Sequence, residues 1–316
     1  MFVFINRYAV AFSVHDSLLN KQLLFLPKIM IPVPGSDSVS CVIPFSRAGN
    51  LILIKAKADT TEGNFILDTG APGLVLNITY FRNYPAVAVL NEEHSGITGS
   101  VDMVTRSQVA QLGFGCVQVN AFPADLISMG HLENSKGVRI LGLLGLSLFK
   151  QFEMIIDYEN SLLYLHRIAK KEAASYKSPM LNDPSAYSTV PIEIWNNKMV
   201  TRTTLAGKKL RLIIDSGAES NLLDSRLPNK VFENVEIIKR VQLAGAGQRK
   251  VEALYGNLNN LTIGDQQTGT MPVIIANLEK TCLVDNSCID GILGFDFLSL
   301  RKIGFNFVRN KMYIWK

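Results

Sequence analysis

Two aspartates of this 316-residue chain stand in matching surroundings, and together they could carry out acid–base chemistry. Residues 65–71 read Phe-Ile-Leu-Asp-Thr-Gly-Ala, and residues 212–218 read Leu-Ile-Ile-Asp-Ser-Gly-Ala. In both stretches an apolar run typical of a buried strand ends in a carboxylate, although charged groups are rarely buried without a partner. We therefore expect Asp68 and Asp215 to be partners. Two carboxylates in contact share one proton, so one can act as a base while the other acts as an acid.

The similarity between these two stretches extends over most of the chain. The two aspartates lie 147 positions apart (215 − 68). Downstream, residues 142–145 (Gly-Leu-Leu-Gly) correspond to residues 291–294 (Gly-Ile-Leu-Gly) at an offset of 149 (291 − 142). Residues 44–165 and 191–314 are therefore predicted to be two copies of one unit. Such a long period indicates a duplicated domain, because the repeats of solenoid proteins span only roughly 20–50 residues.

An Asp-Thr/Ser-Gly-Ala turn after an apolar strand, followed by a Gly-Leu/Ile-Leu-Gly segment, resembles the aspartic proteases. Each half is similar to one subunit of a retroviral-type protease, and the fused pair is similar to the pepsin arrangement. The resemblance covers nearly all of residues 44–314 and implies an all-β fold of two similar lobes with a cleft between them. The expected division is an N-terminal arm at 1–40, a first lobe at 41–168, a linker at 169–186 and a second lobe at 187–316.

The resemblance implies an aspartic endopeptidase with Asp68 and Asp215 as the catalytic pair. One carboxylate would take a proton from a bound water that attacks the peptide carbonyl, while the protonated partner donates to the carbonyl oxygen. No metal or organic cofactor is expected. Hydroxyl groups would hydrogen-bond the opposite loop, and glycines would let each loop turn sharply. The supporting residues expected on this basis are Thr69, Gly70, Ser216 and Gly217.

A glycine-rich turn follows each aspartate, at residues 96–101 in the first half and 244–247 in the second. Glycine at a hairpin tip permits positive φ angles and close backbone approach. The resemblance implies a mobile flap over the substrate, and an ordinary β-turn is the alternative. Pepsin-like enzymes usually have a Tyr near the flap tip, but residues 95–101 contain none, so the turn is closer to the retroviral form. The residues expected to bind substrate here are Gly96, Ile97, Thr98 and Gly99.

Two classes of function fit these features. The first is an endopeptidase acting on an extended polypeptide, with either broad specificity or a single processing target. The second is a non-catalytic protein that binds a peptide or another ligand on an aspartic-protease fold. Two intact Asp-Thr/Ser-Gly turns favour the enzyme, because a chain that had lost turnover would have no reason to keep both. Since one chain carries both aspartates, we expect an active monomer.

The composition argues against several other classes of protein. Hydrophobic residues make up 47% and charged residues 19%, which indicates a globular chain and not a disordered one. The net charge is +5, but the basic residues occur only in short doublets without interleaved aromatics, so nucleic-acid binding is not predicted. The chain contains no run of 18 apolar residues, so no membrane span is predicted. The four histidines show no ligand spacing, and no metal site is expected.

The four cysteines bear on the cellular compartment. Cys282 and Cys288 flank a short loop and could form a disulfide, the alternative being two free thiols. Cys41 and Cys116 have no nearby partner in the sequence and are expected to be single core residues. Residues 1–33 make a poor secretory signal, because charged residues interrupt the apolar stretch. A disulfide would favour an extracytoplasmic location, either periplasmic or secreted.

Overall fold

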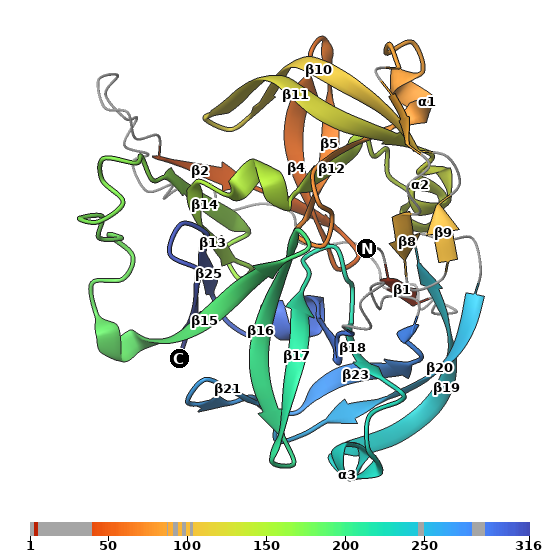
Figure 1. Ribbon diagram of the computed structural model, residues 1–316, viewed down its shortest axis with the longest axis vertical. Helices are drawn as coiled ribbons and strands as arrows, with labels where there is room; N and C mark the ends of the chain where they lie inside the picture. Colours follow the sequence, from red (N-terminus) through yellow and green to blue (C-terminus); the bar gives the residue numbers. More distant parts are fainter. Residues whose placement is uncertain are drawn as a thin grey trace, which may run out of the picture.

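The computed structural model of the chain consists mainly of β-strands joined by tight turns and a few short helices (Figure 1). This confirms the expectation of an all-β fold. In β4 (Leu51–Ala58), for example, exposed Lys55 and Lys57 alternate with buried alanines, the two-residue period of a strand with one face in the core. The structure describes residues 3–5, 40–86, 88–90, 94–96, 99–101, 104–245, 250–279 and 288–316.

The first half of the chain forms an eight-stranded sheet, here called the first-lobe sheet. Its spatial order is β3 (Ser46–Ala48), β4, β5 (Thr61–Asp68), β12 (Gly142–Gly145), β6 (Leu74–Asn77), β11 (Val117–Ile127), β10 (Val104–Phe114) and β7 (Ala88–Leu90). β12 lies between β5 and β6, parallel to β5 and antiparallel to β6. β4 also pairs with the end of β10, where Lys57 lies opposite Gly113, so the sheet closes on itself.

The strands of the second half, here called the second-lobe sheet, follow the same plan. Their spatial order is β15 (Tyr187–Trp195), β16 (Lys198–Leu205), β17 (Lys208–Ile214), β24 (Gly291–Leu293), β18 (Asn221–Asp224), β23 (Met271–Ala276), β20 (Lys250–Leu258), β19 (Val235–Gly245) and β1 (Val3–Ile5). β24 is parallel to β17 and antiparallel to β18, as β12 is to β5 and β6. The closing contact is made by β21 (Thr262–Ile263), which pairs with β16 and with β22 (Gln266–Gln267).

Strands from both halves form a central sheet that joins the two lobes (Figure 1). Its order is β2 (Ser40–Pro44), β14 (Leu162–Arg167), β13 (Phe152–Asp157), β25 (Ile303–Asn306), β26 (Lys311–Trp315) and the start of β15. β13 and β25 pair antiparallel at its middle, with Ile155 opposite Gly304. The largest hydrophobic core follows this sheet and includes Leu163 of the first half and Phe305 of the second. The two lobes are therefore built on a shared sheet and a shared core.

The described helices are all short. They are α1 (Ile78–Phe81), α2 (Gly130–Lys136), η1 (Leu146–Phe149), η2 (Pro184–Ala186), α3 (Asn229–Phe232) and α4 (Phe295–Leu298). None of them is long and apolar enough to cross a membrane. η1 and α4 each follow the Gly-Leu/Ile-Leu-Gly segment of their half. Because both start where the strand beside the aspartate ends, they lie beneath the two Asp turns.

The disulfide bonds of the structure include two cysteines that were expected to be unpaired. Cys41 and Cys116, expected to be single core residues, form a disulfide that links β2 to the turn between β10 and β11. The expectation was wrong because a separation of 75 residues carries no local signal, and the fold brings the two cysteines together. Cys288 is also disulfide-bonded. Cys282, the partner that its spacing predicts, lies outside the described residues.

Candidate active site

Asp68 and Asp215 occupy equivalent places at the ends of two buried strands. Asp68 is the last residue of β5, with Gly145 of β12 opposite it, and Asp215 directly follows β17. Each chain then turns back within three residues, since the N–H of Ala71 donates to the Asp68 carbonyl and the N–H of Ala218 donates to the Asp215 carbonyl, both at 3.2 Å. Both aspartates are completely buried. The fold thus places two carboxyl groups inside the interface between the lobes.

Thr69 and Ser216 join the two turns through reciprocal hydrogen bonds. The N–H of Thr69 donates to Ser216 Oγ, and the N–H of Ser216 donates to Thr69 Oγ1, each at 3.0 Å. Each hydroxyl then donates across the interface to a backbone carbonyl, Thr69 to Ile214 at 3.2 Å and Ser216 to Leu67 at 2.8 Å. Four hydrogen bonds therefore hold the two turns face to face, and each turn supplies donors and acceptors to the other.

The two carboxyl groups pack against glycines of the opposite turn. A Cβ atom added to Gly70 would overlap the carboxylate of Asp215, and one added to Gly217 would overlap that of Asp68. Neither glycine has a positive φ angle. The requirement for glycine is therefore steric: any side chain at either position would push the opposite carboxyl group away. Thr69, Gly70, Ser216 and Gly217 all lie where they bridge or flank the aspartates.

Backbone N–H groups donate to both aspartates, and burial acts on the pKa of Asp215. Asp68 Oδ1 accepts hydrogen bonds from the N–H groups of Gly70 and Ala71, at 2.9 and 3.0 Å, and Asp215 Oδ1 accepts a hydrogen bond from the N–H of Gly217 at 2.8 Å. Burial raises the pKa of Asp215 above its usual range, and the charge of Asp68 and a hydrogen bond with it raise the pKa further. Burial and the neighbouring carboxyl group therefore favour a protonated Asp215.

Lys198 is a charged residue near this pair that the sequence patterns did not single out. It begins β16 next to Met199, which lies opposite Ile214, the residue before Asp215. Burial lowers the pKa of Lys198, while the charge of Asp215 acts in the opposite direction. The first half has Leu51 at the same offset of 147 (198 − 51). The sequence signal that could have identified Lys198 is the replacement of an apolar residue, Leu51, by a charged one at the equivalent position of the repeat.

Glu219 anchors the second Asp turn to the first lobe. Its buried carboxylate forms an ion pair with Lys136 at the end of α2 and accepts a hydrogen bond from the N–H of Asn50 at 3.2 Å. The Asn50 side chain donates in turn to the Glu219 carbonyl at 3.0 Å. The equivalent position of the first half is Pro72 (219 − 147), which offers no charge. The two turns are therefore anchored differently.

The structure describes only part of the flap that is expected at residues 96–99. β8 (His94–Gly96) and β9 (Gly99–Val101) form an antiparallel pair in which Gly96 lies opposite Gly99. Ile97 and Thr98 lie outside the described residues. In the second lobe β19 and β20 form the corresponding hairpin, and β1 adds to its edge with Phe4 opposite Ala244. A hairpin thus follows each aspartate, and the substrate-binding role of residues 96–99 stays a prediction.

The residues around the aspartates do not form a set of metal ligands in the part of the chain that the structure describes. Over these ranges no three or more His, Cys, Asp or Glu side chains come together in a way that could hold a metal ion. What the arrangement offers is a pair of buried carboxyl groups, one of which, Asp215, has a raised pKa. Such a pair can accept and donate a proton in the same reaction.

Residues 201–297 match the family model described as Aspartyl protease. No curated protein matches the chain. The matched segment contains the second Asp-Ser-Gly turn at 215–217, the strand β24 beside it and most of the second-lobe sheet. The match therefore supports an aspartyl protease family for this chain.

Proposed function

We propose that the protein is an aspartic endopeptidase that hydrolyses peptide bonds with Asp68 and Asp215 as its catalytic pair. The observation that carries the proposal is the reciprocal hydrogen bonding of Thr69 and Ser216, which holds two buried carboxyl groups together across the lobes. Each lobe is proposed to be one retropepsin-like repeat, at 41–168 and 187–316, in a pepsin-like pair. The common strand order of the two sheets supports this division.

In the proposed mechanism Asp68 acts as the base and Asp215 as the acid. The ionised Asp68 takes a proton from a water, whose oxygen attacks the carbonyl carbon of the peptide bond. Asp215 gives its proton to the carbonyl oxygen, which produces a neutral tetrahedral intermediate. Asp68 then returns its proton to the amide nitrogen, the C–N bond breaks, and Asp215 recovers a proton from the intermediate. The assignment rests on the raised pKa of Asp215.

The proposed substrate is an extended polypeptide bound between the lobes under the β8–β9 hairpin, with Gly96, Ile97, Thr98 and Gly99 in contact with it. Both aspartates are buried, so the proposal requires them to become accessible when a substrate binds. The chain carries both carboxylates, so the active form is proposed to be a monomer. The Cys41–Cys116 disulfide supports an extracytoplasmic location, because disulfides persist mainly in oxidising compartments.

Replacing the two aspartates tests this function. Asp68→Asn and Asp215→Asn should each lower the rate of cleavage of an unfolded protein by about 10²–10⁴-fold, the usual contribution of general acid–base catalysis. The double variant should be no slower than either single variant, since the two groups act as one unit. The wild-type rate should follow a bell-shaped pH curve. Exposed Asp183→Asn is the matched control and should keep full activity.

A non-catalytic binding protein is the second candidate, and complete burial of both aspartates is the observation that favours it. In that case the wild-type protein would cleave nothing between acid and neutral pH, yet it would bind a random peptide library. The endopeptidase proposal also fails if cleavage persists in either Asn variant. Inhibition by a transition-state mimic directed at retropepsins or pepsins, with no effect of chelators, would support the enzyme.

A further inference from the structure

A pocket of about 540 Å³ lies in the first lobe, away from the catalytic pair. It is lined by Cys116 and residues 117–119 and 122 of β11, by residues 147, 148 and 150–152, and by Arg167 at the end of β14. η1 separates the pocket from the Asp68 turn. Its residues Leu146 and Ser147 donate backbone hydrogen bonds to the carbonyls of Ala71 and Pro72 on one side, and Ser147 and Leu148 line the pocket on the other.

The lining combines an apolar floor with a positively charged rim. Pockets of roughly 300–1,000 Å³ with mostly apolar walls and a few polar groups are typical of small-molecule sites. The lining contains two cations, Lys150 and Arg167, and no acidic residue. Its apolar side chains are Val117, Val119, Phe122, Leu148 and Phe152. Such a surface matches a ligand that has an apolar body and one negatively charged end.

Both cations are held by neutral oxygens. Arg167 Nε and Nη2 donate to Gln151 Oε1 at 3.3 and 3.1 Å, and Lys150 Nζ donates to Asn197 Oδ1 at 3.2 Å. Among the described residues neither cation forms an ion pair. A carboxylate in place of these amide oxygens would make charge-assisted hydrogen bonds, which are roughly twice as strong as neutral ones. Arg167 also offers the planar fork that binds a carboxylate through two hydrogen bonds.

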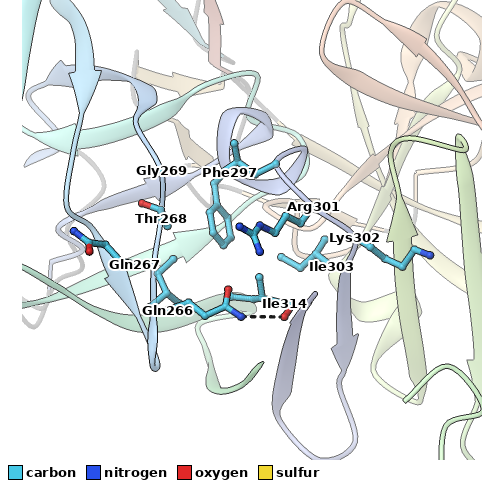
Figure 2. Close-up of a pocket in the computed structure, with 11 residues that line it drawn as sticks. Gln266, Gln267, Thr268, Gly269, Phe297, Arg301, Lys302, Ile303 and Ile314 are labelled. Carbon is cyan, nitrogen blue, oxygen red and sulfur yellow. Dashed lines mark hydrogen bonds between the residues drawn. The ribbon is translucent and has the colours of Figure 1, made fainter. Parts of the chain in front are cut away.

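The equivalent place in the second lobe has only a small pocket, whose lining side chains are drawn in Figure 2. That pocket holds about 40 Å³, room for a few waters at most. It is lined by Gln266 and Phe297, which lie at the offset of 149 from Val117 and Leu148. Gln266 donates to the Ile314 carbonyl, the dashed line in Figure 2, and Phe297 occupies the space beside it. The large pocket is therefore not a necessary consequence of the fold.

We propose that the first-lobe pocket binds a small monocarboxylate with an aliphatic tail, such as a medium-chain fatty acid. The tail lies on Val119, Phe122 and Phe152, and the carboxylate is held by Arg167 and Lys150. Charge complementarity selects the anion, and the volume selects a small molecule over a protein segment. Because no residue of the catalytic pair lines the pocket, this binding does not depend on peptide hydrolysis.

Titration with decanoate, followed by calorimetry at pH 7.5, tests the proposal on the full chain. We expect saturable binding of one decanoate, and at least tenfold weaker binding of uncharged decanol or cationic decyltrimethylammonium. Arg167→Gln should weaken decanoate binding at least tenfold, and Val119→Trp should abolish it by filling the pocket. Arg301→Gln is the matched control, because Arg301 lines the small second-lobe pocket, and it should leave the affinity unchanged. Asp215→Asn should also bind decanoate normally.

Four results would overturn the proposal. These are no saturable decanoate binding, equal binding of decanol, an unchanged affinity of Arg167→Gln, and an unchanged affinity of Val119→Trp. Lys150 and Arg167 are exposed, so their substitution should not unfold the protein, and thermal denaturation of each variant checks this. If an acidic peptide with apolar residues bound at the pocket while decanoate did not, the site would be a protein-docking site instead.

Discussion

The equivalent hairpin turns of the two lobes are held in place by different chemistry. In the first lobe Cys116, directly before β11, forms a disulfide with Cys41 of β2. In the second lobe the equivalent residues are Asp265 (265 − 116 = 149) and Ser188 of β15 (188 − 41 = 147). A hydrogen bond from Ser188 lowers the pKa of Asp265, and Gln266 Nε2 donates to Ser188 Oγ at 2.8 Å. One lobe thus uses a covalent link where the other uses hydrogen bonds.

This difference coincides with a large pocket in the first lobe and a small one in the second. In the first lobe the disulfide holds the hairpin turn, and the shorter Val117 lies where the second lobe has Gln266. The hydrogen-bonded turn needs Gln266 to reach inward, and that side chain fills the equivalent space. The two Asp turns show a second contrast, since Glu219 carries a charged anchor where the first half has Pro72.

Breaking the charged anchor should have the largest effect on stability. Glu219→Gln keeps the hydrogen bond from the Asn50 side chain to the backbone carbonyl of residue 219. It removes the negative charge that pairs with Lys136 in a mostly buried site. Loss of one partner of a buried ion pair typically lowers the free energy of unfolding by about 3–5 kcal/mol. Urea denaturation measures the change, and Pro72→Ala in the other turn is the control, expected within about 1 kcal/mol. Adding Lys136→Met to Glu219→Gln should recover part of the loss; if it does not, the ion pair is not the cause.

Removing the first-lobe disulfide should be the next largest change. The double variant Cys41→Ser, Cys116→Ser opens a link between residues 75 positions apart, which should lower the free energy of unfolding by about 2–4 kcal/mol. The variant is preferable to a reducing agent, because Cys288 is disulfide-bonded as well. Equal stability of the variant and the oxidised wild type would contradict the role assigned to the link.

The protonation of Asp215 should appear in the pH dependence of stability. Its pKa is raised in the folded protein, so the stability that its protonated form contributes is complete below about pH 4, its unfolded value. That stability is lost as the pH rises through the folded value, by about 1.4 kcal/mol for each unit between the two. Asp215→Asn does not titrate, so it should gain stability relative to wild type as the pH rises from 4 towards neutral. The free energy of unfolding is measured by urea denaturation at several pH values. If it changed with pH equally in wild type and Asp215→Asn, the raised pKa of Asp215 would be contradicted.

The smallest effect is expected from the second-lobe hydrogen bonds. Ser188→Ala removes the hydroxyl that contacts Asp265 and Gln266 and should lower the free energy of unfolding by about 1 kcal/mol. Comparison with the Cys41→Ser, Cys116→Ser variant by urea denaturation then ranks the two attachments. A loss from Ser188→Ala as large as that from the disulfide variant would remove the contrast between the lobes.

Much of this protein could be predicted from local patterns in the chain. The recurrence of Asp-Thr/Ser-Gly-Ala after apolar strands indicated a pair of aspartates, and the family resemblance that it carries implied an all-β fold. The structure brings Asp68 and Asp215 together, with Thr69 and Ser216 between the two turns. These features could be predicted because the strand period, the turn residues and the internal repeat are each expressed within short stretches of sequence.

Other features depend on contacts between distant residues and could not be predicted in that way. Cys41 and Cys116 appeared isolated, because the pairing of cysteines is set by the folded distance between their Cα atoms, here 5.8 Å, and not by their spacing. Glu219 and Lys136 meet across the lobes at a separation of 83 residues. Whether the space behind each hairpin is open or filled depends on side chains from several strands. Packing sums many long-range contacts, whereas a sequence pattern reports only neighbours along the chain.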